Sequence, residues 1–374
     1  MTNHHPSATA CWVLALGVLG LCLADHAMAF KLEPEARLHL DYAAHDADAE
    51  PLDDGDIVRR AIIGLKGKAG EDWTFEAAYE LADKGRLRPG DGKFKDVALS
   101  YEGWRVGDFT LGQIKLPFSL EELTSSNDSL FIERALPVDA FAPSRRLGLG
   151  FRHQRDAYTV SAMAFGSSID GDDRGRGLGA RATWVPAQSS TSVLHLGAAV
   201  VVERPRSKVD FDTTPESRVA DEDLVNTGGV EDVRRIDRLG LEAAWRSGPL
   251  TVQTEWLQAW LRRDAGAPGA RLNGGYLATS WLLSGEVRPY KNGRFKGISP
   301  SRSTGAWELT ARLSHIDLDD AGVRGGHERN LTFGLNYHFN EHMRVMFNYI
   351  QVHSQRRGQT DDPHLLLLRL QLAL

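Results

Sequence analysis

Hydrophobic and polar residues alternate along many short stretches of this chain. In residues 30–42 and 331–339, apolar side chains and one proline occupy every second position, and charged, polar or glycine residues lie between them. Successive side chains of a β-strand point to opposite faces of the strand. Each stretch therefore predicts a strand with one apolar side and one polar side.

Sixteen such stretches follow one another, and no apolar run after residue 29 approaches the roughly 18 residues that a membrane-spanning helix needs. An even number of antiparallel strands, each about ten residues long, is what a bacterial outer-membrane barrel requires. The pattern predicts an all-β fold: a 16-stranded antiparallel transmembrane β-barrel formed by residues 30–374, with apolar faces toward lipid and polar faces toward the bore. The predicted strands are residues 31–42, 57–68, 73–82, 93–105, 109–115, 145–153, 157–165, 176–184, 192–202, 235–246, 250–261, 272–283, 305–318, 328–339, 343–353 and 364–374.

The lengths of the connections alternate as well. Those after even-numbered strands are mostly three to seven residues long, whereas those after odd-numbered strands are longer and reach 32 residues at 203–234. Outer-membrane barrels have short periplasmic turns and long external loops, and a soluble β-sandwich has no reason to sort its loops in this way. Tryptophans beside the short turns predict an aromatic girdle at the periplasmic interface: Trp73, Trp104, Trp184 and Trp245.

Two connections differ from the rest. Residues 116–144 lie within a mixed stretch of acidic, basic, aromatic and proline residues, and we expect them to fold into the bore as a constriction loop. Residues 284–304 form a long link on the side where links should be short. Two interpretations stay open for this link: a solvated periplasmic loop, or a cationic patch inside the bore. Its basic residues are Arg288, Lys291, Arg294, Lys296 and Arg302.

Residues 1–29 have the pattern of an export signal. The mostly apolar run Cys11–Leu23 is too short to span a bilayer, and small residues flank Met28, so we expect cleavage after Ala29. Cys11 and Cys22 are the only cysteines, so the mature chain would contain no disulfide and would depend on its backbone ladder and packing. The formal net charge of −6 does not exclude a basic bore.

A family resemblance adds to this reading. The run GQIKLPFSLEELTSS, followed by LFIERAL and FAPSRRLG, resembles the third-loop region of the phosphate-selective porin O and P family. The stretches GGYLATSWLLSGEVRPYKNGRFKGISP, GAWELTARLSHIDL and GLNYHFNEHMRVMFNYI are similar to its C-terminal half. The resemblance implies a trimeric 16-stranded channel of the bacterial outer membrane that passes small anions such as phosphate, polyphosphate or chloride. It also implies inward arginines that guide anions toward lysines at a constriction.

The strand faces suggest which basic residues take these roles. The constriction candidates are Lys115, where the inserted loop begins, and Arg134 within that loop. The alternation places further candidates on inward faces, where they would guide anions: Arg60, Lys66, Arg146, Arg152, Arg181, Arg238 and Arg312. Guanidinium groups bind tetrahedral oxyanions through paired hydrogen bonds, and rings of positive side chains give a pore anion preference.

A second interpretation of these charges stays open. The chain has 34 arginines and ten lysines, and an arginine excess also arises from genome base composition. Acidic residues on the same predicted inward faces would offset the arginines: Glu33, Glu35, Glu76, Glu242, Glu255 and Glu308. The alternative function is therefore a general or mixed-selectivity porin without phosphate specificity.

Other chemistry is less well supported. No motif of a metalloprotease, a serine hydrolase or a phosphate-binding loop is present, so we expect no catalytic residues. The alternatives from other classes are a barrel enzyme and an adhesion barrel with a plugged bore. The acidic loop 41–57 lacks the ligand spacing of a calcium loop, and the spacing of His338 and His342 straddles a predicted turn. We expect no metal, no cofactor and no nucleic acid. The expected partners are small anions, outer-membrane lipid and lipopolysaccharide, and other copies of the chain in a homotrimer.

Overall fold

Sixteen long strands close into a single barrel in the computed structural model, which describes residues 30–83, 85–87, 92–171, 174–206, 208–220, 222–264 and 266–374. The expected signal, 1–29, lies outside these residues. The barrel strands are β1 (Phe30–Asp46), β2 (Gly55–Ala69), β3 (Trp73–Glu80), β6 (Lys93–Tyr101), β7 (Asp108–Ile114), β8 (Arg146–Gln154), β9 (Tyr158–Phe165), β10 (Gly175–Gln188), β11 (Ser192–Pro205), β14 (Val233–Ser247), β15 (Leu250–Arg263), β16 (Ala270–Leu282), β19 (Ala306–Asp320), β20 (Val323–His338), β21 (Met343–Arg356) and β23 (His364–Ala373).

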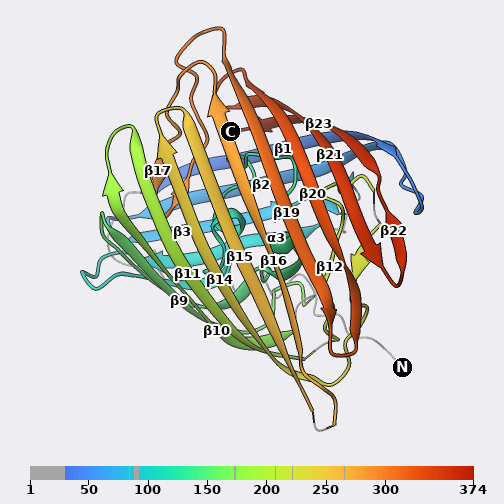
Figure 1. Ribbon diagram of the computed structural model, residues 1–374. Helices are drawn as coiled ribbons and strands as arrows, with labels where there is room; N and C mark the ends of the chain where they lie inside the picture. Colours follow the sequence, from blue (N-terminus) through green and yellow to red (C-terminus); the bar gives the residue numbers. More distant parts are fainter. Residues whose placement is uncertain are drawn as a thin grey trace.

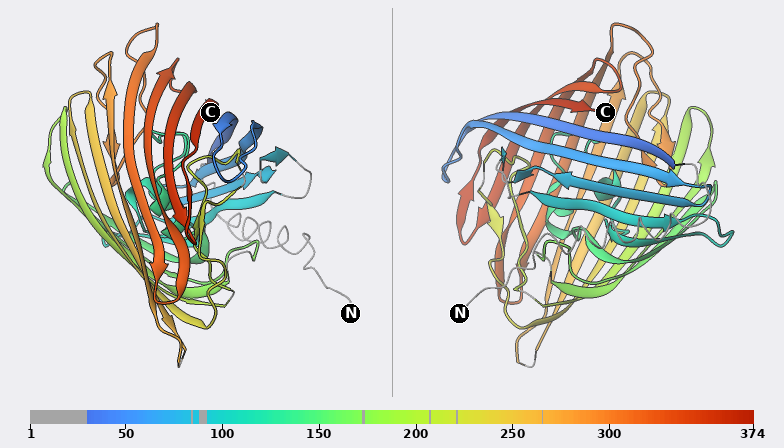
Figure 2. Two further views of the ribbon diagram at one scale, coloured as in Figure 1. Left: turned by 45° about the vertical axis from the view of Figure 1, so that its right-hand side comes forward. Right: turned by 180° about the vertical axis from the view of Figure 1, so that it is seen from behind.

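Each barrel strand pairs with its neighbours in the chain in antiparallel register, and the first strand pairs with the last. This closing contact between β1 and β23 runs from Arg37 opposite Ala373 to Asp46 opposite His364. Closure removes the free edges that an open sheet would expose. The predicted fold class, a 16-stranded antiparallel barrel, is therefore confirmed, and Figures 1 and 2 show the ring of slanted strands from three sides.

The barrel is apolar outside and polar inside along most of its wall. On β20, Phe333 is 49% exposed, whereas Asn330 and Thr332 beside it are fully buried. A water-soluble β-protein would show the reverse arrangement. Ring contacts link Trp73, Tyr101, Trp104 and Phe109 in a row beside the short turns, as a girdle requires. No helix in the described ranges is long and apolar enough to cross a membrane.

The connection lengths follow the predicted alternation with two exceptions. Residues 264–269 and 321–322 are short although they lie on the long-loop side. The reason is that β15, β16, β19 and β20 extend further than the alternation predicted and replace loop with strand. The wall is thus uneven. Strands β3 and β6 to β9, the low wall, have seven to nine residues each, and strands β14, β15, β16, β19, β20 and β21, the tall wall, have 13 to 16.

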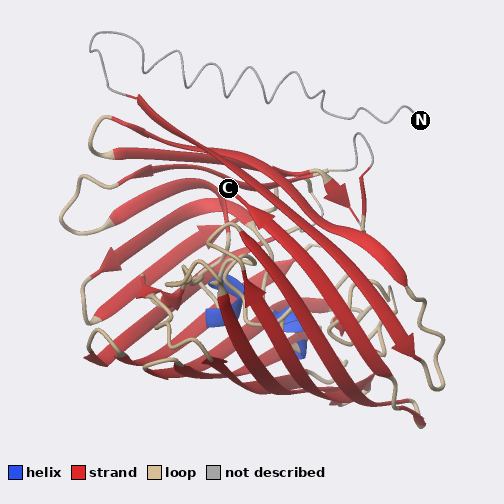
Figure 3. Cartoon of the chain, turned by 90° about the horizontal axis from the view of Figure 1, so that it is seen from above, coloured by secondary structure: helices blue, strands red, loops and turns tan. Residues whose placement is uncertain are grey.

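The bore is not uniformly polar. Residues 116–144 carry the helices α2 (Leu120–Leu123) and α3 (Leu136–Phe141), which lie within the ring of strands in Figure 3. Phe118, Phe131 and Phe141 of this segment pack in one buried cluster with inward apolar side chains of β15, β16 and β19, including Leu257 and Leu272. Residues 206–232, with the short strands β12 (Asp212–Thr213) and β13 (Val225–Asn226), add to the cluster through Phe211 and Val225.

The remaining elements are short. They are the pairs β4 (Ala82–Asp83) with β5 (Arg86–Leu87) and β17 (Tyr290–Lys291) with β18 (Arg294–Phe295), and β22 (Gln359–Asp361), which pairs with β21. The hairpin of β17 and β18 belongs to the link 283–305, and its basic residues take part in the site described next.

Candidate functional site

A cavity of about 1090 Å³ lies inside the barrel along β1 to β10, bounded by residues of the segment 115–145 and of the link 283–305. Fourteen of its lining side chains are basic and eight are acidic. The basic ones are Lys31, Arg37, Arg60, Lys66, Lys68, Lys93, Lys95, Lys115, Arg134, Arg145, Arg152, Arg181, Arg294 and Lys296. A chain with a negative formal charge thus surrounds its described cavity with an excess of positive groups.

Lysine is concentrated at this cavity and arginine is not. Seven of the ten lysines in the chain line it, compared with seven of the 34 arginines. An arginine excess that arises from genome base composition would not place lysines here. The distribution therefore indicates that positive charge at the cavity is a property of the site.

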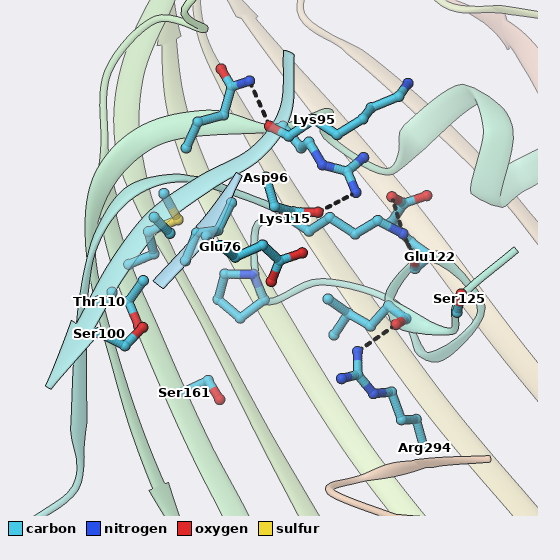
Figure 4. Close-up of a pocket in the computed structure, with 18 of the residues that line it drawn as sticks. Glu76, Lys95, Asp96, Ser100, Thr110, Lys115, Glu122, Ser125, Ser161 and Arg294 are labelled. Atoms are coloured by element: carbon cyan, nitrogen blue, oxygen red, sulfur yellow. Dashed lines mark hydrogen bonds and ion pairs between the residues drawn. The ribbon is translucent and has the colours of Figure 1, made fainter. Parts of the chain in front are cut away.

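Lys115 and Arg134 meet at one carboxylate of the inserted segment. Lys115 Nζ lies 3.1 Å from Glu122 Oε1, and Arg134 Nη1 lies 2.8 Å from Glu122 Oε2. Burial lowers the pKa of Lys115 to about 7. Burial alone would raise the pKa of Glu122, but Arg134 and Lys115 outweigh it and hold the pKa below its ordinary value. Figure 4 shows Lys115 reaching Glu122 across the cavity.

The neighbouring strands β1, β2, β3 and β6 supply a second mixed group together with Arg145. Arg145 Nη2 donates to Asp96 Oδ2 at 2.7 Å, and Lys66 Nζ lies 3.5 Å from Glu76 Oε1 and 2.9 Å from Glu35 Oε2. Asp96 and Glu76 point into the cavity from β6 and β3, close to Lys115 in Figure 4. Positive and negative side chains thus pair directly with one another along the cavity lining.

The link 283–305 reaches this cavity from the side of the short turns. Arg294 Nη1 donates to the carbonyl oxygen of Leu123 at 2.7 Å, so the link touches the inserted segment. Arg181 of β10 donates to the carbonyl oxygen of Gly293 at 3.1 Å, and Lys296 lies 4.0 Å from Asp128. The interpretation of this link as a solvated periplasmic loop does not fit these contacts.

Only part of the link is cationic toward the cavity. Arg294 and Lys296 line it, whereas Lys291 and Arg302 are exposed and do not. Arg288 is buried and forms an ion pair with Glu308 of β19. The hydrophobic alternation could not predict which of these five side chains face the cavity, because the five residues do not lie on a regular barrel strand.

Three of the predicted anion-guiding arginines are buried away from the cavity. Arg146 and Arg238 share Glu203, with closest distances of 3.2 and 2.7 Å. Arg312 lies 2.6 Å from Glu216 and 3.3 Å from Glu121. Their side chains face inward, but carboxylates and the two inserted segments, residues 116–144 and 206–232, cover them. We therefore leave them out of the proposed anion path.

The other predicted residues do line the cavity. Arg60 lies 3.5 Å from Glu80, and Arg152 lies 2.8 Å from Asp108. Sequence reasoning missed six other basic residues that line it: Lys31, Arg37, Lys68, Lys93, Lys95 and Arg145. Arg37 stands on the polar face of the first predicted strand, so the alternation carried the signal for it. Arg145 lies just before the strand that begins at Arg146, where alternation gives no direction.

Wall side chains on the far side hold the inserted segment in place. Glu255 of β15 accepts hydrogen bonds from the backbone amides of Leu120 and Glu121, at 2.8 and 2.7 Å. These are amides at the start of α2 that no backbone carbonyl of the helix accepts. Asn348 of β21 accepts a hydrogen bond from the amide of Ile132 at 2.9 Å, and Arg344 donates to the carbonyl of Ser129 at 2.8 Å.

No group of three or more histidine, cysteine, aspartate or glutamate side chains is placed to hold a metal ion within the part of the chain that the structure describes. The cavity instead combines ammonium, guanidinium and carboxylate groups with hydroxyls such as Ser100, Thr110, Ser125 and Ser161 (Figure 4). These are groups that exchange hydrogen bonds with a hydrated ion.

Comparison with known proteins agrees with the fold. A model of the family described as phosphate-selective porin O and P matches residues 33–374. Porin O of Pseudomonas aeruginosa is 24% identical over an alignment of 402 positions, which covers 95% of this chain and 90% of that one. An anion-selective porin from Comamonas acidovorans has a TM-score of 0.58 at 12% identity, covering 92% of this chain and 100% of that one. A trimer form of OmpT from Vibrio cholerae has a TM-score of 0.58 at 10% identity with the same coverage.

Proposed function

The chain belongs to the phosphate-selective porin O and P family of bacterial outer-membrane barrels, and from this premise we propose that its cavity is the path of a passive channel for small anions, phosphate and polyphosphate among them. The observation that carries the proposal is the concentration of lysine at the cavity. The family and the barrel indicate a channel rather than an enzyme. Solute moves down its own gradient, so the proposal requires no cofactor.

The basic residues of the cavity have two proposed roles: two of them form the constriction, and the others guide anions toward it. We propose that Lys115 and Arg134 lie at the constriction formed by residues 116–144, because both line the cavity and form ion pairs with Glu122 of that segment. The other predicted basic residues that line the cavity would guide anions toward this constriction: Arg60, Lys66, Arg152, Arg181, Arg294 and Lys296. Guanidinium groups offer paired donors to an oxyanion, and the neighbouring carboxylates weaken retention so that the anion leaves again.

Reversal potentials in planar bilayers test this function. In a KCl gradient across a membrane that holds purified channels, we expect a reversal potential of the sign that chloride permeation produces. Lys115→Glu and Arg134→Glu should each reduce it, whereas Lys291→Glu, at an exposed position outside the cavity, should leave it unchanged. Cation preference in the unmodified protein would contradict the proposal.

A general or mixed-selectivity porin is the second candidate function. The observation that favours it is the pairing of cavity bases with carboxylates, as for Lys115, Arg145 and Lys66. The two candidates differ in how phosphate affects a chloride current. A phosphate-preferring channel should lose chloride conductance when a small excess of phosphate is added, because phosphate occupies the path. A general porin should show only the change in bulk conductivity.

The uneven wall supports a homotrimer. A strand needs about nine to 11 residues to cross the hydrocarbon layer, and β7 has seven. We propose that neighbouring subunits, rather than lipid, cover this low wall. Leu111→Cys on the outer face of β7 should give crosslinked oligomers under oxidation, and Leu277→Cys on the tall wall should not. Leu111 and Leu277 are 65% and 54% exposed in the single chain, so they form a matched pair.

A further inference from the structure

The outer face of the tall wall is ordered in rows that the strand register defines. At the end beside the short turns, Trp245 on β14 and Trp281 on β16 project outward and are 43% and 53% exposed. Leu241, Leu277 and Leu313 continue an apolar surface toward the opposite end. Trp245 and Trp281 therefore mark the periplasmic edge of the lipid-facing band.

A second tryptophan marks the outer edge. Trp260 of β15 pairs with Asp237 on one side and Arg271 on the other, so the three residues form one outward row. Arg271 lies ten residues from Trp281 along β16. At about 3.3 Å per residue and a strand tilt of about 35–45°, this separates the two rows by about 23–27 Å along the membrane normal. The apolar band of an outer-membrane barrel is about 25 Å tall, so Trp260 lies at the level of the outer headgroups.

Three arginines gather at this level. Asp237 accepts a hydrogen bond from Nε of Arg235 at 2.6 Å and from Nε of Arg262 at 2.7 Å, which holds the two guanidinium groups side by side. Their side chains are 39% and 58% exposed, so both remain accessible from outside the barrel. Arg262 and Arg271 line a groove of about 480 Å³ together with Trp260, Asp237 and Asp320.

The next row toward the membrane centre contains polar side chains at hydrocarbon depth. Gln258 and Asn273 pair across β15 and β16 on the outward face. Gln258 is only 1% exposed, and its Nε2 has no hydrogen-bond partner. Gln258 is thus covered by the chain itself and is not part of the groove lining, so the polar contacts of the groove are confined to the level of Trp260.

We propose that this groove binds the phosphorylated headgroup of a lipopolysaccharide molecule in the outer leaflet. Arg262 and Arg271 would bind a phosphate, and Trp260 would lie against the sugar ring. Arg262 and Arg271 balance Asp237 and Asp320 in the lining, and Arg235, which pairs with Asp237 beside the groove, adds the positive charge that attracts an anionic headgroup. The proposal is independent of the cavity and of anion transport.

Binding of defined lipids to the full-length purified channel tests the proposal. The probes are bis-phosphorylated lipid A and its dephosphorylated form in detergent, with bound lipid measured by native mass spectrometry. Each arginine near an anionic lipid surface contributes roughly a fivefold factor, so Arg262→Gln combined with Arg271→Gln should weaken binding of the phosphorylated probe about 30-fold. Arg263→Gln is the matched control, because Arg263 on the same strand end donates instead to the carbonyl of Glu231 and does not line the groove.

The outcomes separate the alternatives. The proposal is supported if the double variant binds phosphorylated lipid A more weakly and the control binds it normally. The unmodified channel should bind dephosphorylated lipid A only weakly, and the chloride conductance of the double variant should be unchanged. Equal binding of the two lipids, or no loss in the double variant, would overturn the proposal. If the double variant no longer retains radiolabelled inorganic phosphate but still binds lipid A normally, the groove binds free phosphate instead.

Discussion

Anion preference should depend on pH through Lys115, a partly buried lysine of the cavity. Lys115 forms an ion pair with Glu122, and burial lowers the pKa of its ammonium group to about 7. The ammonium is positive below this pKa and neutral above it. Raising the pH from 6 to 8 therefore removes positive charge from the proposed constriction, and anion preference should fall. Arginine keeps its charge throughout this interval, so Lys115→Arg provides the matched control.

The structure gives the size of the effect. With a pKa of about 7, roughly nine in ten Lys115 side chains are charged at pH 6 and roughly one in ten at pH 8. A unit charge 4 Å away stabilises an anion in water by about 1 kcal/mol, which is roughly a fivefold factor in occupancy. Salt and the remaining basic residues screen part of this energy. We expect the chloride-to-potassium permeability ratio to fall about two- to fivefold.

The assay is the reversal potential of the purified channel in a KCl gradient at pH 6, 7 and 8. Chloride is the permeant anion because inorganic phosphate changes its own charge near neutral pH and would obscure the result. No histidine lines the described cavity, so histidine titration does not add to the change. Lys115→Arg should show a clearly smaller fall between pH 6 and 8 than the unmodified channel, because the charge at position 115 persists. Lys115→Met should have a lower ratio than the unmodified channel at pH 6 and a similar ratio at pH 8.

Two results would refute the reasoning. A ratio that stays constant from pH 6 to 8 in the unmodified channel would show that Lys115 does not lose its proton in this interval. An equally large fall in Lys115→Arg would show that another group titrates and that Lys115 is not responsible. Unchanged single-channel conductance at pH 6 in Lys115→Arg confirms that the control preserves the path.

Three further perturbations test other parts of the structure. Glu255→Ala removes the acceptor of two backbone amides and should increase open-channel noise and mean conductance, measured in single-channel records, because the inserted segment loses an anchor that contributes about 1–3 kcal/mol. Arg312→Met leaves the buried Glu216 without its cation and should destabilise the barrel by about 3–5 kcal/mol, seen as a lower temperature of heat modification on gels. Arg294→Gln should lower anion preference in the reversal-potential assay, whereas Lys291→Gln should not, since only the former lines the cavity.

The barrel could be predicted from the sequence because its signals are local. Alternation with a period of two gives the strands, and the faces follow once lipid rather than protein covers the apolar side. All 16 predicted strands are present, with ends that differ by a few residues. The prediction of long external loops failed at 264–269 and 321–322, because the β-strands there continue beyond the lipid layer. Outside the lipid, outward side chains need not be apolar, so the hydrophobic pattern does not reveal these strand ends.

The site was only partly predictable for a different reason. Alternation tells which face a side chain occupies, but not what covers that face. Arg152 and Arg312 are both inward arginines, yet Arg152 lines the cavity and Arg312 is 2% exposed beneath the two inserted segments. The covering segments are irregular, and their contacts join residues as far apart as Ile132 and Asn348. No short-range pattern carries that information.

The position of the cavity follows from how the two inserted segments are held. Phe118, Phe131 and Leu136 pack against inward apolar side chains of the tall wall, and burying each contributes about 1.5–3 kcal/mol. This packing is non-directional, so buried polar anchors such as Glu255 set the register of the segment. The tall wall therefore carries the filled half of the bore, and the charged cavity lies along β1 to β10. It follows that inward substitutions on β15 to β23 should alter stability and gating, whereas those lining the cavity should alter selectivity.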